Sequence, residues 1–229
     1  MFKKRSRVIL LAILSVIIII VAFVIFIYLG SQSGPVAVSG VNAGDEFTYD
    51  IKGFWSSSDP DVTPSESFLQ FNLTEWYKVT VTGVSDAEIS INTTWRFNNG
   101  TELEGTGTVN VETGITYPTG GFWAIYTANL RAGDYVRPMG VDRSTINETT
   151  TRYYGAGGTR ETNSILLILE YYDADDPTYS TTWTDYMNTY FDRQTGMLVE
   201  LRDTNVYTNP QRTLTILWTI KDTNVWTIS

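Results

Sequence analysis

The chain has 229 residues, of which 16 are basic and 25 acidic, and it contains neither histidine nor cysteine. The missing residue types exclude Ser-His-Asp triads, cysteine nucleophiles and zinc sites built from cysteine or histidine, so any catalysis would rest on carboxylates, lysine, tyrosine, serine or threonine. The net charge of −9 argues against nucleic acid as a partner, because an acidic surface repels phosphates.

The first 30 or so residues differ in composition from the rest. Residues 1–7 include four basic side chains, and residues 8–29 follow as 22 positions without a charge. A bilayer core of ~30 Å needs roughly 20 apolar helical residues, so this run predicts a transmembrane helix. It is longer than the ~7–15 apolar residues of a signal peptide, and no A-x-A-like cleavage site follows it. We therefore expect an uncleaved signal-anchor with residues 1–7 in the cytoplasm. The Gly/Ser-rich residues 30–44 would be a tether.

Residues 45–229 are expected to form one extracellular β domain. Without the basic tail, 12 basic and 25 acidic residues remain, a net charge of −13. Apolar and aromatic residues alternate with polar ones, which predicts strands that bury one face. The clearest examples lie at 47–55, 77–81, 87–97, 181–192, 197–207 and 214–220.

Turn and helix signals lie between these strands. Residues 63–66 have the spacing of a capping box, which predicts a short helical turn. Residues 98–100, Asn-Asn-Gly, predict a hairpin with a type I′ turn. Gly105 and Gly107 indicate a bulge or a sharp bend in the next strand. Residues 120–134 place apolar side chains three and four apart, which predicts a helix of about two turns.

Two later segments predict positions within the sheet. Residues 144–154 are polar and rich in threonine, which is typical of an edge strand, whereas residues 165–169 (ILLIL) indicate a central strand covered on both faces. About nine or ten strands joined by hairpins favour a mainly β domain with an antiparallel sheet. It would be a curved sheet or half-barrel with a short helix, or a β-sandwich.

Four N-x-S/T patterns are candidate glycosylation sites if the domain lies outside the cell: Asn72, Asn92, Asn99 and Asn147. Asn92 lies on the outward row of its predicted strand, and Asn99 at the tip of the hairpin turn. A sugar at either position would therefore disturb the fold little.

Seven tryptophans are spread through the predicted outer domain. They fit core packing, and they also fit an aromatic-lined groove for a lipid or a sugar. The candidates for a ligand groove are Trp76, Trp123 and Trp183. Trp76 lies on the polar side of its strand beside Lys78, which indicates an exposed ring.

The remaining chemistry of the chain rests on carboxylates. Asp173, Asp175 and Asp176 are weak calcium candidates, but they lack the EF-hand pattern, and a solvated turn is the preferred interpretation. We therefore expect no metal and no cofactor. Paired carboxylates could hydrolyse a glycoside, although no spacing in the sequence selects a pair.

Two resemblances add to this interpretation. The stretch YFDRQTGMLVEL, residues 190–201, resembles a hairpin of lipoprotein-carrier-like proteins, which implies a curved antiparallel sheet with an apolar cavity for acyl chains. The whole layout is similar to archaeal signal-anchored cell-surface β-domain proteins, with GDEFTYDI, FWAIYTANLRAGD and YFDRQTG carrying the likeness. That resemblance implies a location and an architecture.

The sequence thus predicts a single-pass membrane protein whose main domain is a non-enzymatic binding or envelope-interaction module. Its partners would be the membrane, through residues 8–29, and a lipid, a glycan or a surface-layer protein. A structural filament or surface-layer component of the pilin or archaellin type is one alternative, although Ser6 and Arg7 stand where a prepilin processing site would have Gly or Ala. A carboxylate-based hydrolase is the second.

Overall fold

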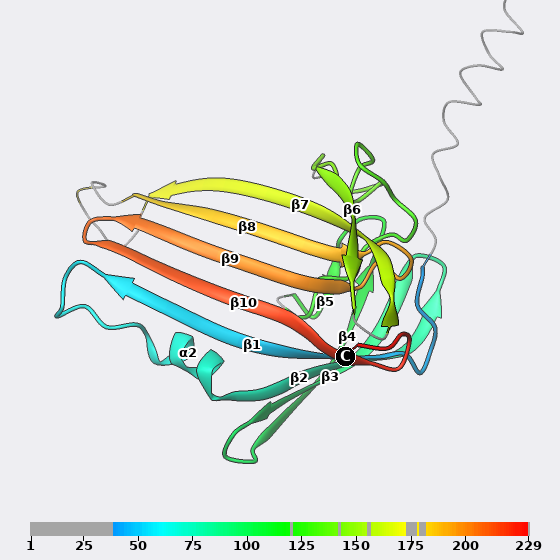
Figure 1. The fold of residues 1–229 in the computed structure, drawn as a ribbon, viewed down its shortest axis with the longest axis horizontal. Helices are drawn as coiled ribbons and strands as arrows, with labels where there is room; N and C mark the ends of the chain where they lie inside the picture. Colours follow the sequence, from blue (N-terminus) through cyan, green and yellow to red (C-terminus); the bar gives the residue numbers. More distant parts are fainter. Residues whose placement is uncertain are drawn as a thin grey trace, which may run out of the picture. The chain divides into compact units, whose positions relative to one another are not determined.

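The structure, a computed structural model, describes residues 39–119, 121–141, 143–154, 157–172, 178 and 182–228 (Figure 1). The strands are β1 (Glu46–Ser57), β2 (Thr74–Ser85), β3 (Glu88–Phe97), β4 (Glu102–Asn110), β5 (Thr116–Tyr117), β6 (Glu148–Tyr153), β7 (Thr159–Tyr172), β8 (Thr182–Asp192), β9 (Leu198–Thr208) and β10 (Gln211–Thr223). The helical elements are α2 (Glu66–Leu69) and the 3₁₀ helix η1 (Gln70–Leu73). The prediction of a mainly β domain is confirmed.

All ten strands belong to one sheet in the order β5-β4-β3-β2-β1-β10-β9-β8-β7-β6. Every neighbouring pair is antiparallel. Strands β1–β5 and β6–β10 are therefore two meanders that meet where β1 pairs with β10. In Figure 1, β7 to β10 and β1 run side by side, and β2 to β4 continue the sheet beyond β1. The single sheet decides against a sandwich of two separate sheets.

One face of this sheet carries the hydrophobic core, and we call it the packed face. Alternate residues of the first strands point into it, as their spacing predicts, and all of these are buried: Phe47, Tyr49, Ile51, Val79, Val81, Ile89 and Ile91. The segment 121–136, which connects β5 toward β6, contributes Ile125, Tyr126, Leu130 and Val136 to the same cluster. This segment therefore serves as the cover of the packed face, and the opposite face is the outer face.

The covering segment is not a helix, so the helix predicted at 120–134 is wrong. Residues 121–130 are irregular and extended, and the Tyr126 N–H donates to the Gly196 carbonyl at 2.9 Å. All residues from 124 to 128 are buried, whereas an amphipathic helix would leave one side in water. The apolar spacing reflects burial on several sides, and the backbone partners come from the β8–β9 turn.

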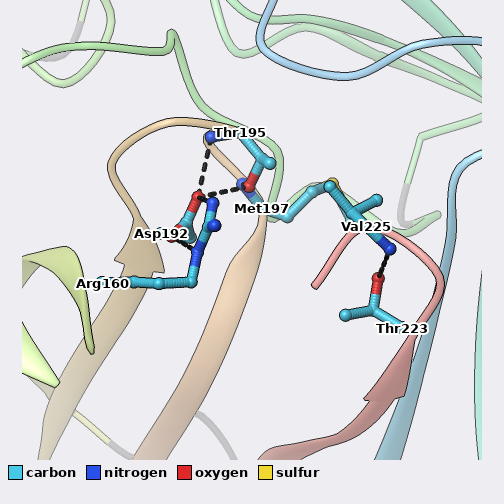
Figure 2. A network of polar contacts seen from close by, with 6 residues as sticks. All are labelled: Arg160, Asp192, Thr195, Met197, Thr223 and Val225. Carbon is cyan, nitrogen blue, oxygen red and sulfur yellow. Dashed lines mark hydrogen bonds and ion pairs between the residues drawn. The ribbon is translucent and has the colours of Figure 1, made fainter. Parts of the chain in front are cut away.

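That β8–β9 turn is held by a buried carboxylate (Figure 2). Asp192 accepts hydrogen bonds from the backbone N–H and the hydroxyl of Thr195 at 2.8 and 2.9 Å. Arg160 of β7 donates to both oxygens of Asp192, at 2.7 and 2.9 Å. The Thr195 hydroxyl oxygen accepts in turn from the Met197 N–H at 3.2 Å. The hairpin predicted around this turn is confirmed, and its Asp-x-x-Thr-Gly sequence supplies the bonds that close it.

The β3–β4 hairpin is also confirmed, but its turn is not of type I′. The Phe97 N–H donates to the Thr101 carbonyl at 2.9 Å, and the Gly100 N–H donates to the Phe97 carbonyl at 2.8 Å. Gly100 has a φ of 83°, and Asn99 is not among the described residues with positive φ. A type I′ turn needs positive φ at both central residues, so this is a three-residue loop with its glycine in the left-handed region.

Gly105 and Gly107 do not create a bulge, which was one of the two features predicted; the sharp bend stays a prediction. The register between β3 and β4 runs without a shift. A Cβ on Gly105 would lie 2.8 Å from the Thr93 hydroxyl, and one on Gly107 would lie 3.0 Å from the Tyr117 carbonyl oxygen. These glycines therefore permit close packing beside β4.

Strand β7 is not central, so the prediction for 165–169 is wrong in that respect. The polar strand β6 is the edge, as predicted, but it pairs with β7 only as far as Ser164. Beyond that residue β8 is the one described strand that pairs with β7. Leu166, Ile168 and Leu169 are consequently 42%, 53% and 41% exposed. The apolar run therefore lies in the part of β7 that no longer pairs with β6.

The short helical turn is confirmed, with a shifted start. Helix α2 begins at Glu66, and the hydroxyl of its N-cap Ser65 accepts from the Phe68 N–H at 3.3 Å. Phe68 is buried over Gly53, where a Cβ would meet its ring at 3.1 Å. The helix begins two residues later than the capping-box spacing predicts, because its cap is a serine inside that motif.

Several predictions fall outside the described residues. These are the tail 1–7, the transmembrane helix 8–29, most of the tether and the calcium candidates Asp173, Asp175 and Asp176. Within the part of the chain that is described, no helix has the length and apolar character needed to cross a bilayer. The last residues of the expected tether, 39–44, pack on the domain, and Val41 is buried in its core.

The contact between the β8–β9 turn and the covering segment can be tested with one methyl group. Gly196 has a φ of 75°, and a Cβ there would lie 2.0 Å from the Tyr126 carbonyl oxygen. Gly100 has a similar φ of 83°, with nothing within 4 Å of its Cβ position. We expect Gly100→Ala to lower the free energy of unfolding by about 1–2 kcal/mol, the cost of the left-handed backbone.

Gly196→Ala should cost about 4 kcal/mol or more, because the steric clash adds to the same backbone cost. Urea unfolding of both variants measures the difference. Equal losses in the two variants would show that the covering segment can move away from the turn without penalty.

Candidate functional site

The packed face of β7, β8, β9, β10 and β1 presents its side chains in four rows that follow the strand register. The first row lies nearest the covering segment and contains Ile165, Thr189, Leu201, Trp218 and Ile51. The second contains Leu167, Met187, Asp203, Ile216 and Gly53. The third contains Leu169, Asp185, Asn205, Leu214 and Trp55. The fourth contains Tyr171, Trp183, Tyr207, Arg212 and Ser57.

Exposure changes between the first row and the others. Four of the five residues in the first row are buried, and Trp218 is half-buried. In the second row all five residues are half-buried, and most of the third and fourth rows is half-buried or exposed. The covering segment therefore closes one end of the packed face and leaves an apolar surface open at the other.

Two hollows lie at the closed end, on either side of Trp123. One has a volume of about 230 Å³ and is lined by Tyr77, Trp95, Gly121, Phe122, Trp123, Ala124, Leu198, Leu201 and Trp218. The other has a volume of about 280 Å³, and Trp123, Tyr126, Arg137, Leu167, Met187 and Thr189 are among its lining residues. Trp123, one of the groove candidates from the sequence, contributes to both, and Leu167 and Met187 connect the second hollow to the open rows.

Aromatic contacts fix the shape of the first hollow. The ring of Tyr77 lies 5.0 Å from that of Trp218, 6.1 Å from Trp95 and 6.2 Å from Phe122. Burial raises the pKa of the Tyr77 hydroxyl. Such edge and stacked pairs hold rings in fixed positions, so the hollow has rigid walls.

A buried cation holds the covering segment in place beside the second hollow. Arg137 is 7% exposed, and its guanidinium donates to the carbonyl of Trp123 at 3.0 Å and also to that of Ile125. It lies 4.4 Å from the centre of the Tyr126 ring, and burial raises the pKa of the Tyr126 hydroxyl to about 12. Arg137 thus acts as a clamp that sets the position of Trp123.

The open rows contain two carboxylates that the sequence analysis did not identify. Asp203 lies opposite Met187, and Asp185 opposite Asn205, so the two acids are diagonal neighbours on the packed face. Burial raises the pKa of Asp203 to about 7, and repulsion by Asp185 and a hydrogen bond with it add to the rise. Asn205 donates to Asp203 at 3.0 Å. The available signal was an aspartate in the inward row of each predicted strand.

The other two groove candidates lie elsewhere. Trp76 is half-buried, with Lys78 and Arg96 at 5.9 and 6.0 Å from its ring centre. Trp183 is stacked between Tyr171 and Tyr207, with ring centres at 4.3 and 5.7 Å. Trp183 belongs to the fourth row, so it lies on the same face as Trp123 but far along the strands from it.

All four glycosylation candidates are exposed, although their amides differ in their contacts. Both amide atoms of Asn72 bond the backbone of Gly53, at 2.8 and 2.9 Å. Asn99 accepts from the Thr101 N–H, and Asn147 accepts from the Leu166 N–H. Asn92 lies on the outward row of β3. Glycosylation of Asn92, like that of the other three asparagines, stays a prediction.

No protein-family model matches this chain, and none of the curated proteins compared with it matches either. In the described part of the chain, no group of three or more acidic side chains is placed to hold a metal ion.

The amide of Asn72 has a structural role that a longer side chain should disrupt. Asn72→Gln moves the amide by one methylene and breaks both bonds to Gly53, so we expect a loss of about 1–3 kcal/mol in the free energy of unfolding. The matched control, Asn92→Gln, should stay within about 0.5 kcal/mol of the wild type. Urea unfolding in protein from a host without N-glycosylation measures both, and equal stabilities would contradict the assignment.

The raised pKa of Asp203 predicts how stability depends on pH. The folded state keeps a proton that the unfolded chain releases near the ordinary value of 3.8. Stability should therefore fall as the pH rises from about 4 to about 7 and stay at the lower level above that. Asp203→Asn mimics the protonated acid and should remove this loss.

Because Asp203 is partly open to solvent, we discount the full shift and expect a gain of about 1 kcal/mol at about pH 8, or roughly 2–4 °C in Tm. At about pH 5 the variant and the wild type should differ less, since most Asp203 is then protonated. Thermal melts at both pH values measure this difference. The same difference in Tm at both pH values would contradict the assignment to Asp203.

Proposed function

We propose that this protein is a membrane-anchored, extracellular, non-enzymatic binding module whose packed face holds an apolar ligand such as a lipid chain. The observation that carries the proposal is the partial cover of the packed face. Apolar side chains of β7 to β10 lie in register beyond the covering segment and remain half-exposed, among them Leu167, Met187, Leu214 and Ile216. An antiparallel sheet normally packs one face and solvates the other.

The outer face of β9 and β10 shows the contrast. Thr204 of β9 and Thr215 of β10 share a hydrogen bond of 3.0 Å between their hydroxyls, and Thr213 and Thr219 lie on the same side of β10. That part of the outer face is suited to water, whereas the outer face of β7 exposes Leu166 and Ile168. Covering the apolar rows of the packed face would gain about 25 cal/mol for each Å² removed from water.

The dimensions of the hollows favour an elongated ligand. Each hollow, at about 230 and 280 Å³, is smaller than the ~300–1,000 Å³ of a typical small-molecule site. A chain that enters beside Trp123 and continues over Leu167 and Met187 would use both a hollow and the open rows. The hairpin likeness to lipoprotein carriers supports the same ligand class.

The location in this proposal comes from the sequence. Residues 8–29 anchor the chain, the N-terminus is cytoplasmic and the β domain is outside. The net charge of −13 suits a solvated exterior, and the exposed asparagines allow glycans there. A glycan or a surface-layer protein could then contact the outer face while the ligand lies on the packed face.

One observation also favours a carboxylate-based hydrolase, because Asp185 and Asp203 are neighbours on one face. Glycoside hydrolysis needs two carboxyl groups that flank a sugar ring. Asp185 is only 8% exposed, recessed in a row that includes Leu169 and Leu214. We therefore rank binding above hydrolysis.

Ile216 and Leu217 give a matched pair of variants for the binding proposal. They are consecutive and both half-buried, and they point to the packed and the outer face of β10. Native mass spectrometry of the full chain from its own membranes should show a lipid adduct on the wild type and on Leu217→Asn. Ile216→Asn should lose at least about 90% of it, because a buried polar group without a partner costs ~1–3 kcal/mol.

Lipid held around the membrane helix is common to both variants, so their difference reports on the β domain alone. A wild type that carries no adduct, or two variants with equal lipid content, would overturn the proposal.

A further inference from the structure

One buried carboxylate oxygen on the packed face has no hydrogen-bond partner among the described residues. Asp185 is 8% exposed, and its Oδ1 makes no hydrogen bond with any described residue. Its neighbours in the row are Leu169 and Asn205. Leaving a buried acceptor unsatisfied is unfavourable by ~1–3 kcal/mol, and more for a charged group. Such an atom on a half-open apolar face points to a donor that arrives from outside the chain.

Asp203 adds a second acceptor beside it. Asp203 is half-buried and accepts from Asn205 through Oδ1. No Lys or Arg of the described residues forms an ion pair with Asp185 or Asp203. Burial beside Asp185 raises the pKa of Asp203 to about 7, so near neutral pH Asp203 keeps its proton for part of the time.

The next row of the packed face already places one cation over an aromatic ring. It contains Trp183 stacked between Tyr171 and Tyr207, and the guanidinium of Arg212 already lies 4.1 Å from the centre of the Tyr207 ring. Ammonium groups also bind over aromatic rings within about 6 Å. The acidic domain, with its net charge of −13, attracts cations from solution.

We propose that Asp185 and Asp203 form the head-group subsite of the packed face and bind a protonated amine attached to an apolar chain. This rests on the proposed apolar-ligand function and names its ligand class. The ammonium donates one N–H to Asp185 Oδ1 and another to Asp203, while the chain lies over Met187 and Ile216 toward the hollows. Two carboxylates prefer a cation to a neutral hydroxyl, because only the cation offsets their mutual repulsion.

Binding is coupled to a proton. Below about pH 7, Asp203 holds a proton before binding; after binding Asp203 is ionised and its proton has left to solvent. On this face the neighbouring titratable groups are Tyr171 of β7, Tyr207 of β9 and Arg212 of β10, whereas β1 presents Gly53 and Trp55. Affinity for the amine should therefore rise with pH until Asp203 is ionised.

The test uses the full chain in phosphatidylcholine nanodiscs, with empty nanodiscs as the blank. Hexylamine is the cationic probe and 1-hexanol its neutral counterpart of similar shape. Isothermal titration calorimetry in two buffers with different ionisation enthalpies should show release of up to one proton for each amine bound at about pH 6, and almost none at about pH 9. Hexanol should bind with no proton release.

Variants separate the subsite from general charge effects. Asp185→Asn and Asp203→Asn should each weaken hexylamine binding at least about tenfold at about pH 8 and leave hexanol unchanged. Asp222→Asn, which removes an exposed charge from β10 of the same sheet, should change the binding of neither hexylamine nor hexanol. The proton release of the wild type does not depend on any variant folding.

Three outcomes divide the two proposals. Preference for the amine that both Asp→Asn changes abolish supports the subsite. Equal binding of hexylamine and hexanol, or amine binding that the Asp→Asn changes leave intact, overturns the subsite while apolar binding stands. Binding of neither probe overturns the subsite and the apolar-ligand function together.

Discussion

The carboxylate of Asp192 is the contact on which the rest of this fold depends. It is fully buried, and it accepts from Arg160 on one side and from Thr195 on the other. A buried ion pair adds little net stability over a hydrophobic replacement, but a bidentate Arg–carboxylate pair requires a definite geometry of its partners. Here that arrangement fixes the β8–β9 turn, and the Gly196 carbonyl of this turn then holds the covering segment through Tyr126. The position of Trp123 between the two hollows follows from this sequence of contacts together with the hydrogen bond from Arg137.

The sequence could predict the parts of the fold that depend on local periodicity. The alternation in β1 to β3 and the hairpin around residues 193–196 follow from period-two burial and from turn chemistry, and both are confirmed. The covering segment could not be predicted in this way. Its backbone partners are about 70 residues further along the chain, so its apolar spacing matched a helix that tertiary contacts override. The run at 165–169 failed for a related reason, since an apolar strand is central only where a neighbour extends as far as it does.

The candidate site was predictable only in part. Trp123 is one of the tryptophans that the sequence offers for an aromatic-lined groove, and it lines both hollows. The Asp185–Asp203 pair needs the register between β8 and β9, which a single strand pattern does not contain. In the sequence, each aspartate is only a single polar residue among the inward-facing positions of its strand. Their proximity, and the unpartnered oxygen of Asp185, emerge only when the strands are paired.

A sheet that is covered at one end only has a consequence for stability as well as for binding. The buried first row and the covering segment supply the core, so the domain can fold with the other rows open. A ligand on those rows would bind the folded state and not the unfolded chain, and it would raise stability by RT ln(1 + [L]/Kd). The open rows are therefore an apolar surface that resembles a core but has no layer covering it. Two acids in such a surface would weaken a self-contained fold, but they make sense where the missing layer carries its own positive charge.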